Sequence, residues 1–300
     1  MTSYQPITRD NAAQLVEIAR ARCGFITEVV WSADGRALAV AHGGGVMLWR
    51  DGFGGAPTLT FQPHDGPVKS LAFSSDDVIL ATAGADATVR LCTAADGRLM
   101  TTLRDHRDSV DAIAFSANGA LLATGSADMT VRVLDMTETA RRQVLRGHED
   151  EITDIAFVGS ALASSSRDTT VRLWTSGGDH TVLRGHTDWV RALACSADGR
   201  SLASSSRDGT ARLWNVATAQ ERLSLPHDGD SRAVAFSRDG SLLATDDLGV
   251  MRLWDATTGE LLTGIEAHAK PILSLAFHPN GTWLASGSGD NTVRLWGVPG

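Results

Sequence analysis

The chain has 300 residues, an ordinary apolar content of 43% and a formal net charge of −8. The acidic balance argues against nucleic-acid binding, which depends on basic groups that neutralise phosphates. The sequence has no apolar run of about 18 residues that would predict a transmembrane helix, and its N-terminus has no signal-peptide pattern. We therefore expect neither a membrane partner nor a nucleic-acid partner.

Cysteine and lysine usage is unusual. The three cysteines, Cys23, Cys92 and Cys195, are too few and too scattered for a disulfide framework. Cys92 and Cys195 occupy positions that are aromatic in other parts of the chain, which predicts buried thiols and a reducing, cytoplasmic compartment. Lys69 and Lys270 are the only lysines among 27 basic residues, a bias that suggests a GC-rich bacterial genome.

A unit of about 40 residues repeats along the chain. Leu-Arg-Gly-His at 145–148 recurs at 183–186, and Val-Arg-Leu-Trp at 171–174 is matched by Ala-Arg-Leu-Trp at 211–214. Equivalent positions near the end of the third strand show that there are seven units. These positions are Trp49, Cys92, Leu134, Trp174, Trp214, Trp254 and Trp296. Each unit is expected to pack on its neighbours, as in other repeat proteins.

The chain begins with a leader, residues 1–13, before the first unit. Residues 14–20 align with the fourth strands of other units, which places Arg22 where those units have histidine. The last unit, conversely, ends four residues after Trp296 and lacks a fourth strand. We therefore predict that residues 14–20 form the outer strand of the last unit and close a ring over residues 14–300.

Each unit is predicted to contain four short antiparallel strands. In the unit at 186–225, the residue pattern predicts strands at 190–195, 201–204, 210–214 and 221–225. Asp-Gly or Asn-Gly turns separate the first two strands in five units, and glycine readily takes the positive φ that such turns need. The sequence shows no helical pattern of about ten residues, so the chain is predicted to be all-β.

The repeat resembles that of the WD40 repeat family over residues 14–300. The resemblance implies a seven-bladed β-propeller of four-stranded antiparallel blades around a central channel. It also implies a hydrogen-bonded tetrad in each blade: a histidine before the first strand, a serine or threonine in the second, an aspartate in the next turn and the tryptophan of the third. The complete tetrads are His148, Ser164, Asp168 and Trp174; His186, Ser204, Asp208 and Trp214; and His268, Ser286, Asp290 and Trp296. Such a network satisfies polar groups that are costly to bury unpaired.

Four units depart from the tetrad pattern. Cys92 and Leu134 replace the tryptophan in the second and third units, and the sixth unit has no clear aspartate because its turn at 246–249 is one residue short. The first unit has Arg22 and Gly43 instead of the histidine and the aspartate. We expect packing to hold these four blades more than polar networks do.

Serine, histidine and aspartate occur together in three units, which superficially suggests hydrolysis. A catalytic triad, however, needs an exposed nucleophile, a base and an oxyanion hole at one site. Repetition at equivalent positions favours a structural role, so we expect no catalytic residue, no cofactor and no bound metal.

Two further groups of polar residues have ordinary structural interpretations. The acidic residues of the sixth unit favour a solvated face over a cation site. They are Asp228, Asp230, Asp246 and Asp247. The isolated histidines lack metal-ligand spacing and are expected on the surface or in loops. They are His42, His180 and His278.

The rim of the ring is the remaining candidate for function. In the WD40 family, partners usually dock on the face that carries the loop before the first strand and the turn after the second, here called the top face. The candidate residues on it are Phe25, His42, Glu149, Glu151, Arg167, Thr187, Trp189, Arg207, Asp228, Asp230 and Asp247. Trp189, Arg167 and Arg207 are the strongest of these, because Trp and Arg dominate binding energy where they are desolvated. The alternative is that Trp189 folds onto its own blade while the arginines pair with Glu149 or Glu151.

The sequence thus predicts a monomeric, non-enzymatic scaffold that binds a protein or peptide partner on the top face. Two alternatives stay open: a propeller-scaffold enzyme of the lyase or hydrolase type, and a recognition module for a small molecule or glycan. The enzyme alternative requires an isolated cluster of acid, base or metal ligands at the channel mouth, and no unique cluster is visible in the sequence.

Overall fold

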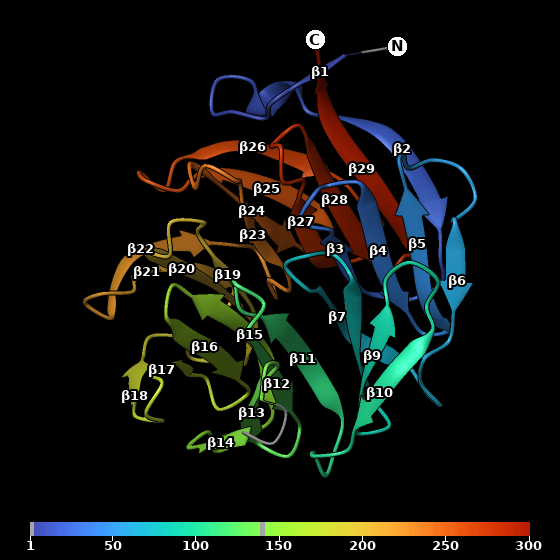
Figure 1. The fold of residues 1–300 in the computed structure, drawn as a ribbon. Coiled ribbons are helices and arrows are strands. Elements are labelled where there is room, and N and C mark those ends of the chain that lie inside the picture. Colours follow the sequence, from blue (N-terminus) through green and yellow to red (C-terminus); the bar gives the residue numbers. More distant parts are fainter. Residues whose placement is uncertain (1–2, 139–141) are drawn as a thin grey trace.

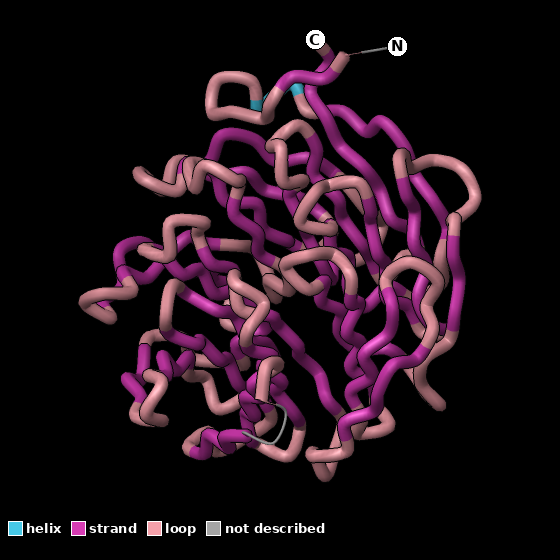
Figure 2. The backbone as a smooth tube through the Cα atoms, in the orientation of Figure 1, coloured by secondary structure: helices cyan, strands magenta, loops and turns pink. Residues whose placement is uncertain are grey.

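The structure, a computed structural model, describes residues 3–138 and 142–300. Within these residues the strands form seven antiparallel sheets arranged around a central axis as the blades of a propeller (Figure 1). Strands and loops make up nearly all of the described chain, and the one helical element is the short 3-10 helix η1 (Ala12–Gln14) (Figure 2). The prediction of an all-β, seven-bladed propeller is confirmed.

The first strand of each blade lies nearest the central axis, and the second strand pairs with it (Figure 1). The first strands are β3 (Ile26–Trp31), β7 (Val68–Phe73), β11 (Val110–Phe115), β15 (Ile152–Val158), β19 (Val190–Cys195), β23 (Val234–Phe236) and β27 (Ile272–Phe277). The second strands are β4 (Ala37–His42), β8 (Ile79–Gly84), β12 (Leu121–Ser126), β16 (Ala161–Ser166), β20 (Ser201–Ser206), β24 (Leu242–Asp247) and β28 (Trp283–Ser288).

The third strands continue each blade outward, and the fourth strands follow them. The third strands are β5 (Gly45–Arg50), β9 (Val89–Thr93), β13 (Thr130–Asp135), β17 (Val171–Trp174), β21 (Thr210–Asn215), β25 (Val250–Asp255) and β29 (Thr292–Pro299). The fourth strands are β6 (Leu59–Phe61), β10 (Leu99–Leu103), β14 (Arg142–Arg146), β18 (His180–Leu183), β22 (Gln220–Pro226), β26 (Leu261–Glu266) and, for the last blade, β2 (Val16–Arg22). A further strand, β1 (Tyr4–Gln5), joins the sheet of the last blade.

Tight turns with a repeated side-chain pattern connect the first and second strands. In the fifth blade, Ser196 Oγ donates to Asp198 Oδ1 (2.6 Å), and the same carboxylate accepts a main-chain N–H two residues further on (3.0 Å). Gly199 follows the aspartate with a φ of +68°, in the left-handed region that glycine adopts without steric cost. The Asp-Gly signal in the sequence therefore predicted these turns for a physical reason.

The hydrophobic core lies between blades. Between the third and fourth blades, for example, Ala112 and Val131 pack with Ile152 and Ile155 of the next blade. Adjacent blades approach so closely that a Cβ atom added to Gly125 would lie 2.5 Å from Ile152 Cγ2. Each blade therefore depends on its neighbours for burial of its apolar side chains, and the ring gains stability by closing.

The ring is closed by an N-terminal strand, as predicted. β2 pairs antiparallel with β29 from Val16 opposite Gly297 to Arg22 opposite Thr292. The strand lies two residues further along the chain than the expected 14–20, because residues 12–14 form η1.

The leader contributes to the same blade. Tyr4 pairs with Pro299 in the sheet, and Ile7, Ala12 and Leu15 are buried in the core of the last two blades. Residues 1 and 2 of the expected leader lie outside the described residues.

Arg22 does not occupy the histidine position that the sequence suggested. In the third blade Thr130 is opposite Arg146, and the fourth-blade His148 follows two residues later. Arg22 is the counterpart of Arg146, since it is opposite Thr292. The histidine position of the first blade is therefore taken by Gly24, and this blade has no imidazole there.

Candidate partner-binding surface

The complete tetrads are assembled as hydrogen-bonded networks. In the fourth blade, His148 bonds to Asp168 through Nδ1 (2.7 Å) and to Ser164 Oγ through Nε2 (2.8 Å). The indole N–H of Trp174 donates to the same Ser164 Oγ (2.8 Å). The fifth and seventh blades repeat these bonds at 2.7 to 3.0 Å. Each network ties the loop before the first strand to the second and third strands of the same blade.

The tetrad carboxylates are strongly acidic in the folded protein. Burial alone would raise the pKa of Asp168, but the hydrogen bonds from His148 and Thr170 together outweigh it, and the pKa lies well below its ordinary value. The same balance lowers the pKa of Asp208. Each aspartate is therefore held as an anion that orients its histidine.

The tetrad hydroxyls are inaccessible. Ser164, Ser204 and Ser286 are each fully buried, and each already binds an imidazole and an indole. A substrate has no route to these oxygens, and no residue of the tetrads meets the exposure that a nucleophile requires. The geometry is that of a fold-stabilising network.

The divergent blades keep parts of the tetrad. In the second blade, His64 still bonds to Thr82 (2.8 Å) and Asp86 (2.9 Å), although Cys92 replaces the tryptophan. The third blade has the same arrangement around His106. In the sixth blade the histidine and tryptophan share Thr245, while the aspartate bond is replaced by a main-chain carbonyl. Polar networks therefore contribute to these three blades as well.

Trp189 is the centre of a cation–π cluster on the top face. Its ring lies beneath three guanidinium groups, with centroid distances of 4.5 Å to Arg167, 5.1 Å to Arg191 and 5.0 Å to Arg207. The indole is half-buried, so part of it remains accessible. We call Trp189 and these three arginines the arginine–tryptophan cluster.

Acidic partners hold two of the arginines in place. Arg167 pairs with Glu151 (2.9 Å), and Arg207 pairs with Asp188 (3.6 Å). This is nearer to the second alternative from the sequence: Arg167 pairs with Glu151, whereas Arg207 pairs with Asp188 and not with Glu149 or Glu151, and the arginines cover a Trp189 ring that is half-buried. The arrangement presents planar, partly exposed cations over an aromatic ring.

Arg191 and Arg232 join this surface, and the sequence did not single them out. Both guanidinium groups bind Asp230: Arg191 through Nε (3.1 Å) and Nη2 (2.9 Å), and Arg232 through Nη2 (2.9 Å). Arg191 lies two residues after Trp189, at the β-bulge between Val190 and Ala192, and its guanidinium group reaches the Trp189 ring. That spacing was the available signal.

The other predicted residues are divided between accessible and buried positions. Phe25 is 55% exposed, and Thr187, Glu149 and Asp228 are also exposed. His42 and Asp247, in contrast, are buried, so neither is positioned to touch a partner directly. Both take the last position of the second strand, which is also buried in the blades that have serine there.

Three of these polar side chains have specific structural roles. His42 Nδ1 accepts the Gly44 N–H (3.0 Å), and Asp247 Oδ1 accepts the Asp228 N–H (3.0 Å). His278, expected on the surface or in a loop, is buried and packs edge-on against Trp31 and Trp283.

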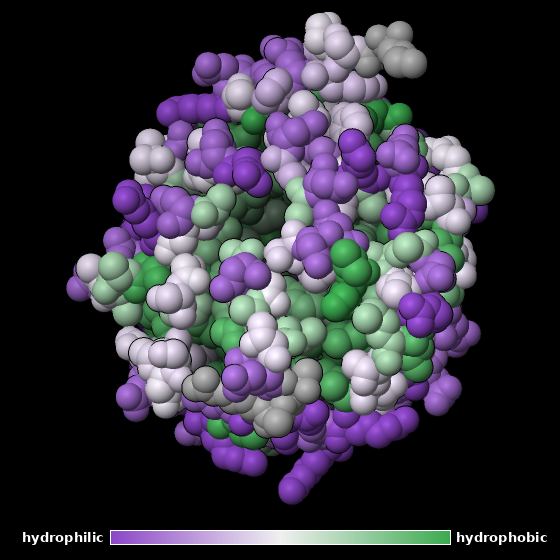
Figure 3. Space-filling view, in the orientation of Figure 1, coloured by the Kyte–Doolittle hydropathy of each residue, from purple (hydrophilic) through white to green (hydrophobic). Residues whose placement is uncertain are grey.

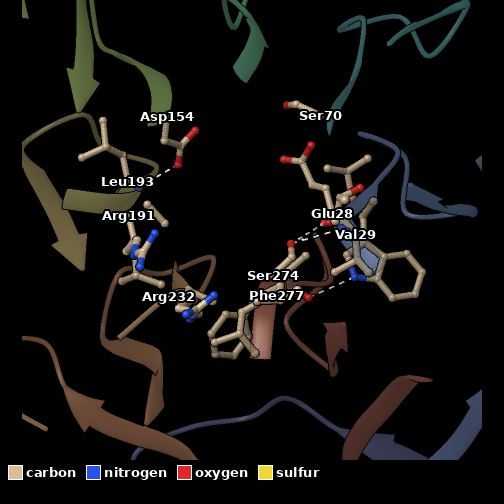
Figure 4. Close-up of a pocket in the computed structure, with 18 of the residues that line it drawn as sticks. Glu28, Val29, Ser70, Asp154, Arg191, Leu193, Arg232, Ser274 and Phe277 are labelled. Atoms are coloured by element: carbon tan, nitrogen blue, oxygen red, sulfur yellow. Dashed lines mark hydrogen bonds between the residues drawn. The ribbon is translucent and has the colours of Figure 1, made fainter. Parts of the chain in front are cut away.

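A cavity of about 560 Å³ occupies the central channel between the first strands (Figure 4). Glu28 on β3 and Asp154 on β15 extend into it, and each accepts an N–H from the first strand of the next blade: Leu71 N–H to Glu28, and Leu193 N–H to Asp154 (2.7 Å). Burial raises the pKa of Glu28 to about 8 and that of Asp154 to about 7. Both carboxyl groups therefore link neighbouring blades at the channel wall.

Figure 3 shows one whole face of the molecule. Its middle is hollowed and largely apolar, and hydrophilic side chains surround it. Among the described residues, no helix is both long and apolar enough to cross a membrane. No group of three His, Cys, Asp or Glu residues within 3–138 and 142–300 is arranged to hold a metal ion.

The chain belongs to the WD40 repeat family. The family model described as WD domain, G-beta repeat matches residues 55–92, 97–135, 140–175, 177–215, 220–255 and 259–297. These matches begin after β5, so they leave out the first three strands of the divergent first blade.

Individual relatives match parts of this chain. It is similar to nuclear distribution protein PAC1 of Coccidioides posadasii, with 29% identity over 163 residues (46% of this chain, 34% of the relative). It is also similar to small ribosomal subunit protein RACK1y of Oryza sativa subsp. japonica, with 35% identity over 127 residues (41% and 37%). A PAC1 protein of Gibberella zeae is 38% identical over 165 residues (46% and 36%). The matches span about a third of each relative, and because these relatives are eukaryotic they do not support the bacterial origin that lysine usage suggested.

Proposed function

We propose that this chain is a non-enzymatic scaffold that binds a protein or peptide partner on the top face. The observation that carries the proposal is the arginine–tryptophan cluster. Tryptophan and arginine are the residues most enriched at binding hot spots, and three guanidinium groups around one half-buried indole concentrate them. The paired acids Glu151 and Asp188 keep the arginines ordered, which lowers the entropy lost on binding.

The relatives support a role in assemblies. The rice relative is named as a protein of the small ribosomal subunit. The propeller also offers what a scaffold needs: a rigid ring whose loops vary while its tetrads hold the blades.

The test is affinity capture with the full chain as bait. We expect the W189A/R207A double variant to lose the partners that the wild-type chain retains from its source cells. R200A is the matched control, because Arg200 is exposed on the hairpin turn at the opposite end of β19 and β20. Thermal unfolding of the double variant should be nearly unchanged. Equal capture by all three proteins would contradict the proposal.

A second candidate is small-molecule recognition in the central channel. The 560 Å³ cavity has the size of a ligand site, and Glu28 and Asp154 supply polar groups of raised pKa. A small molecule that raises the melting temperature of the wild-type chain, but not of E28Q/D154N, would favour this candidate. Turnover that survives W189A/R207A and disappears in E28Q/D154N would favour an enzyme.

We also propose that the chain is a monomer in a reducing, cytoplasmic compartment. The three cysteines are unpaired, and burial raises the pKa of the Cys23 and Cys195 thiols to about 11, which keeps them unreactive. Light scattering at working concentration tests the monomer, and an unchanged melting temperature on adding reductant tests the absence of disulfides.

A further inference from the structure

The arginines of the fifth and sixth blades converge on one carboxylate. Arg191 on β19 donates to both carboxylate oxygens of Asp230. Arg232, which lies just before β23, pairs with one of the same oxygens. Two guanidinium groups from different blades around one carboxylate form the bidentate geometry by which arginine recognises carboxylates in general. The surface therefore contains a formed carboxylate site, which Asp230 of the chain itself occupies.

The segment that carries Asp230 is not part of the sheet. β23 has three residues, whereas the other first strands have six or seven within the described residues. Residues 230–233 precede β23 with no strand assignment. Fewer ladder hydrogen bonds hold this stretch than hold the start of any other blade.

The apolar anchor of the segment is also missing. Six blades place a fully buried isoleucine or valine where the first strand begins. These are Ile26, Val68, Val110, Ile152, Val190 and Ile272. The register of the sixth blade puts Ser231 at this position, since Val234 is opposite Thr245 as Ile155 is opposite Ser164.

The Ser231 side chain is buried without a hydrogen-bond partner among the described residues, although its main-chain N–H donates to Ser206 O (3.1 Å). Its Oγ and that of Ser205 are both fully buried, and both lack partners among the described residues. Ser205 is the counterpart of Gly125, whose missing Cβ would touch Ile152, so it faces Ser231 across the interface. Unpaired buried hydroxyls cost free energy, which makes the segment easier to displace than its counterparts.

Displacing Asp230 would leave the surface strongly cationic. With Asp230 in place, the four arginines 167, 191, 207 and 232 face three acids, Glu151, Asp188 and Asp230. Without it, four cations face two acids, on a chain whose net charge is −8. The ligand that best complements this surface is an acidic segment.

We infer that the partner segment is acidic and that one of its carboxylates replaces Asp230 between Arg191 and Arg232. The inference rests on the proposed docking at the top face. Asp230 acts as an internal competitor: it keeps the two arginines arranged while the surface is empty, and it gives way together with Gly229 and Ser231 when a partner binds, while Arg232 stays at the site. The apparent affinity is lowered by the fraction of molecules in which Asp230 occupies the site.

The test uses an acetylated, amidated hexaglutamate peptide with a fluorescent label, measured by anisotropy against the full chain. We expect D230N to bind it about tenfold more tightly than the wild type, because the competitor is removed. D228N is the matched control: it makes the same charge change two residues away, on an exposed side chain that pairs with Arg252 instead. We expect D228N to change affinity less than about twofold. R191Q and R232Q should each weaken binding.

A second variant keeps the test independent of Asp230. S231V supplies the apolar anchor that the other blades have, so it should hold the segment in place and weaken hexaglutamate binding. The inference is overturned if D230N binds no more tightly than D228N, even where W189A/R207A still loses its native partners; that outcome leaves the proposed function intact. Tighter binding of a phosphoserine hexapeptide or of single-stranded DNA than of hexaglutamate would also overturn it.

Discussion

Arg294 on the last strand donates to Glu17 on the ring-closing strand, with Nη1 2.9 Å from Oε2, although 277 positions separate the two residues in the sequence. The pair lies in the ladder between β2 and β29, where main-chain bonds and buried side chains supply most of the stabilisation. A partly exposed ion pair adds at most about 1 kcal/mol. The ion pair therefore lies where the ring closes but contributes little of the free energy that stabilises the closure.

Deletion of residues 1–22 should destabilise the whole ring. It removes β2, exposes the edge of β29 and takes Ile7, Ala12 and Leu15 out of the core. We expect a large fall in the melting temperature by circular dichroism. Deletion of residues 1–3, which leaves β1 and β2, is the control and should have little effect. E17Q should cost less than about 1 kcal/mol. A melting temperature unchanged by the long deletion would refute the closure argument.

The S204A variant should be strongly destabilised. It leaves the Trp214 indole N–H and His186 Nε2 buried without a partner, at an expected cost of about 2–4 kcal/mol in the free energy of unfolding. Guanidinium denaturation measures this cost. The control is S201A on the same strand, whose hydroxyl accepts from exposed Arg222 and should change stability by less than about 0.5 kcal/mol. Equal costs would show that the tetrad is not a stabilising network.

Stability should fall as the pH rises from 6.5 to 8.5. The pKa values of Glu28 and Asp154 are raised to about 8 and about 7, above their ordinary values of 4.5 and 3.8. At pH 6.5 the unfolded chain has already released both protons, whereas the folded chain still holds most of them and releases them as the pH rises through the window. The stabilisation present at low pH is therefore lost as the pH passes through the folded pKa values. Burial lowers the pKa of His64, His106, His227 and His268 below the ordinary 6.5, so these side chains oppose the trend near the lower end of the window.

Comparison of melting temperatures at the two pH values tests this dependence. E28Q cannot ionise at that position, so its melting temperature should fall less than that of the wild type. E149Q, at an exposed acid, should keep the wild-type slope. If E28Q and the wild type lose stability equally, Glu28 is not a buried, protonated link.

The S231V variant should be more stable than the wild type. It removes one unpaired buried hydroxyl and restores the branched residue found at the same position in Val68, Val110 and Val190. We expect a gain of about 1 kcal/mol by guanidinium denaturation. S237V is the contrasting change, because Ser237 Oγ bonds to Asp239 and should be costly to lose. A loss of stability in S231V would show that the hydroxyl is satisfied in solution.

The sequence predicted the blade count, the strand order and the turns, because the repeat fixes all three. It misplaced the closing strand by two residues. An even shift keeps the same side chains on each face, so alternation cannot distinguish the registers, and Gly24 provides no histidine to anchor the alignment.

The proposed binding surface was harder to predict. Trp189, Arg167 and Arg207 were found because repeat positions identify the rim. The convergence of Arg191 and Arg232 on Asp230 depends on the late start of β23, which a repeat template does not contain. His42 and Asp247 were misplaced because the turns of their blades are short, so residues that were aligned with the rim belong to the buried last position of the second strand.

The pairing of β2 with β29 also determines when the protein can finish folding. During synthesis β2 is made before any complete blade, and β29 is the last of the propeller's described strands to emerge. Until then β2 has no partner, and the interface between the last and first blades cannot form. A product truncated before β29 would keep two open sheet edges, which favour aggregation and proteolysis. The ring can therefore close at this seam only after all seven blades have been synthesised.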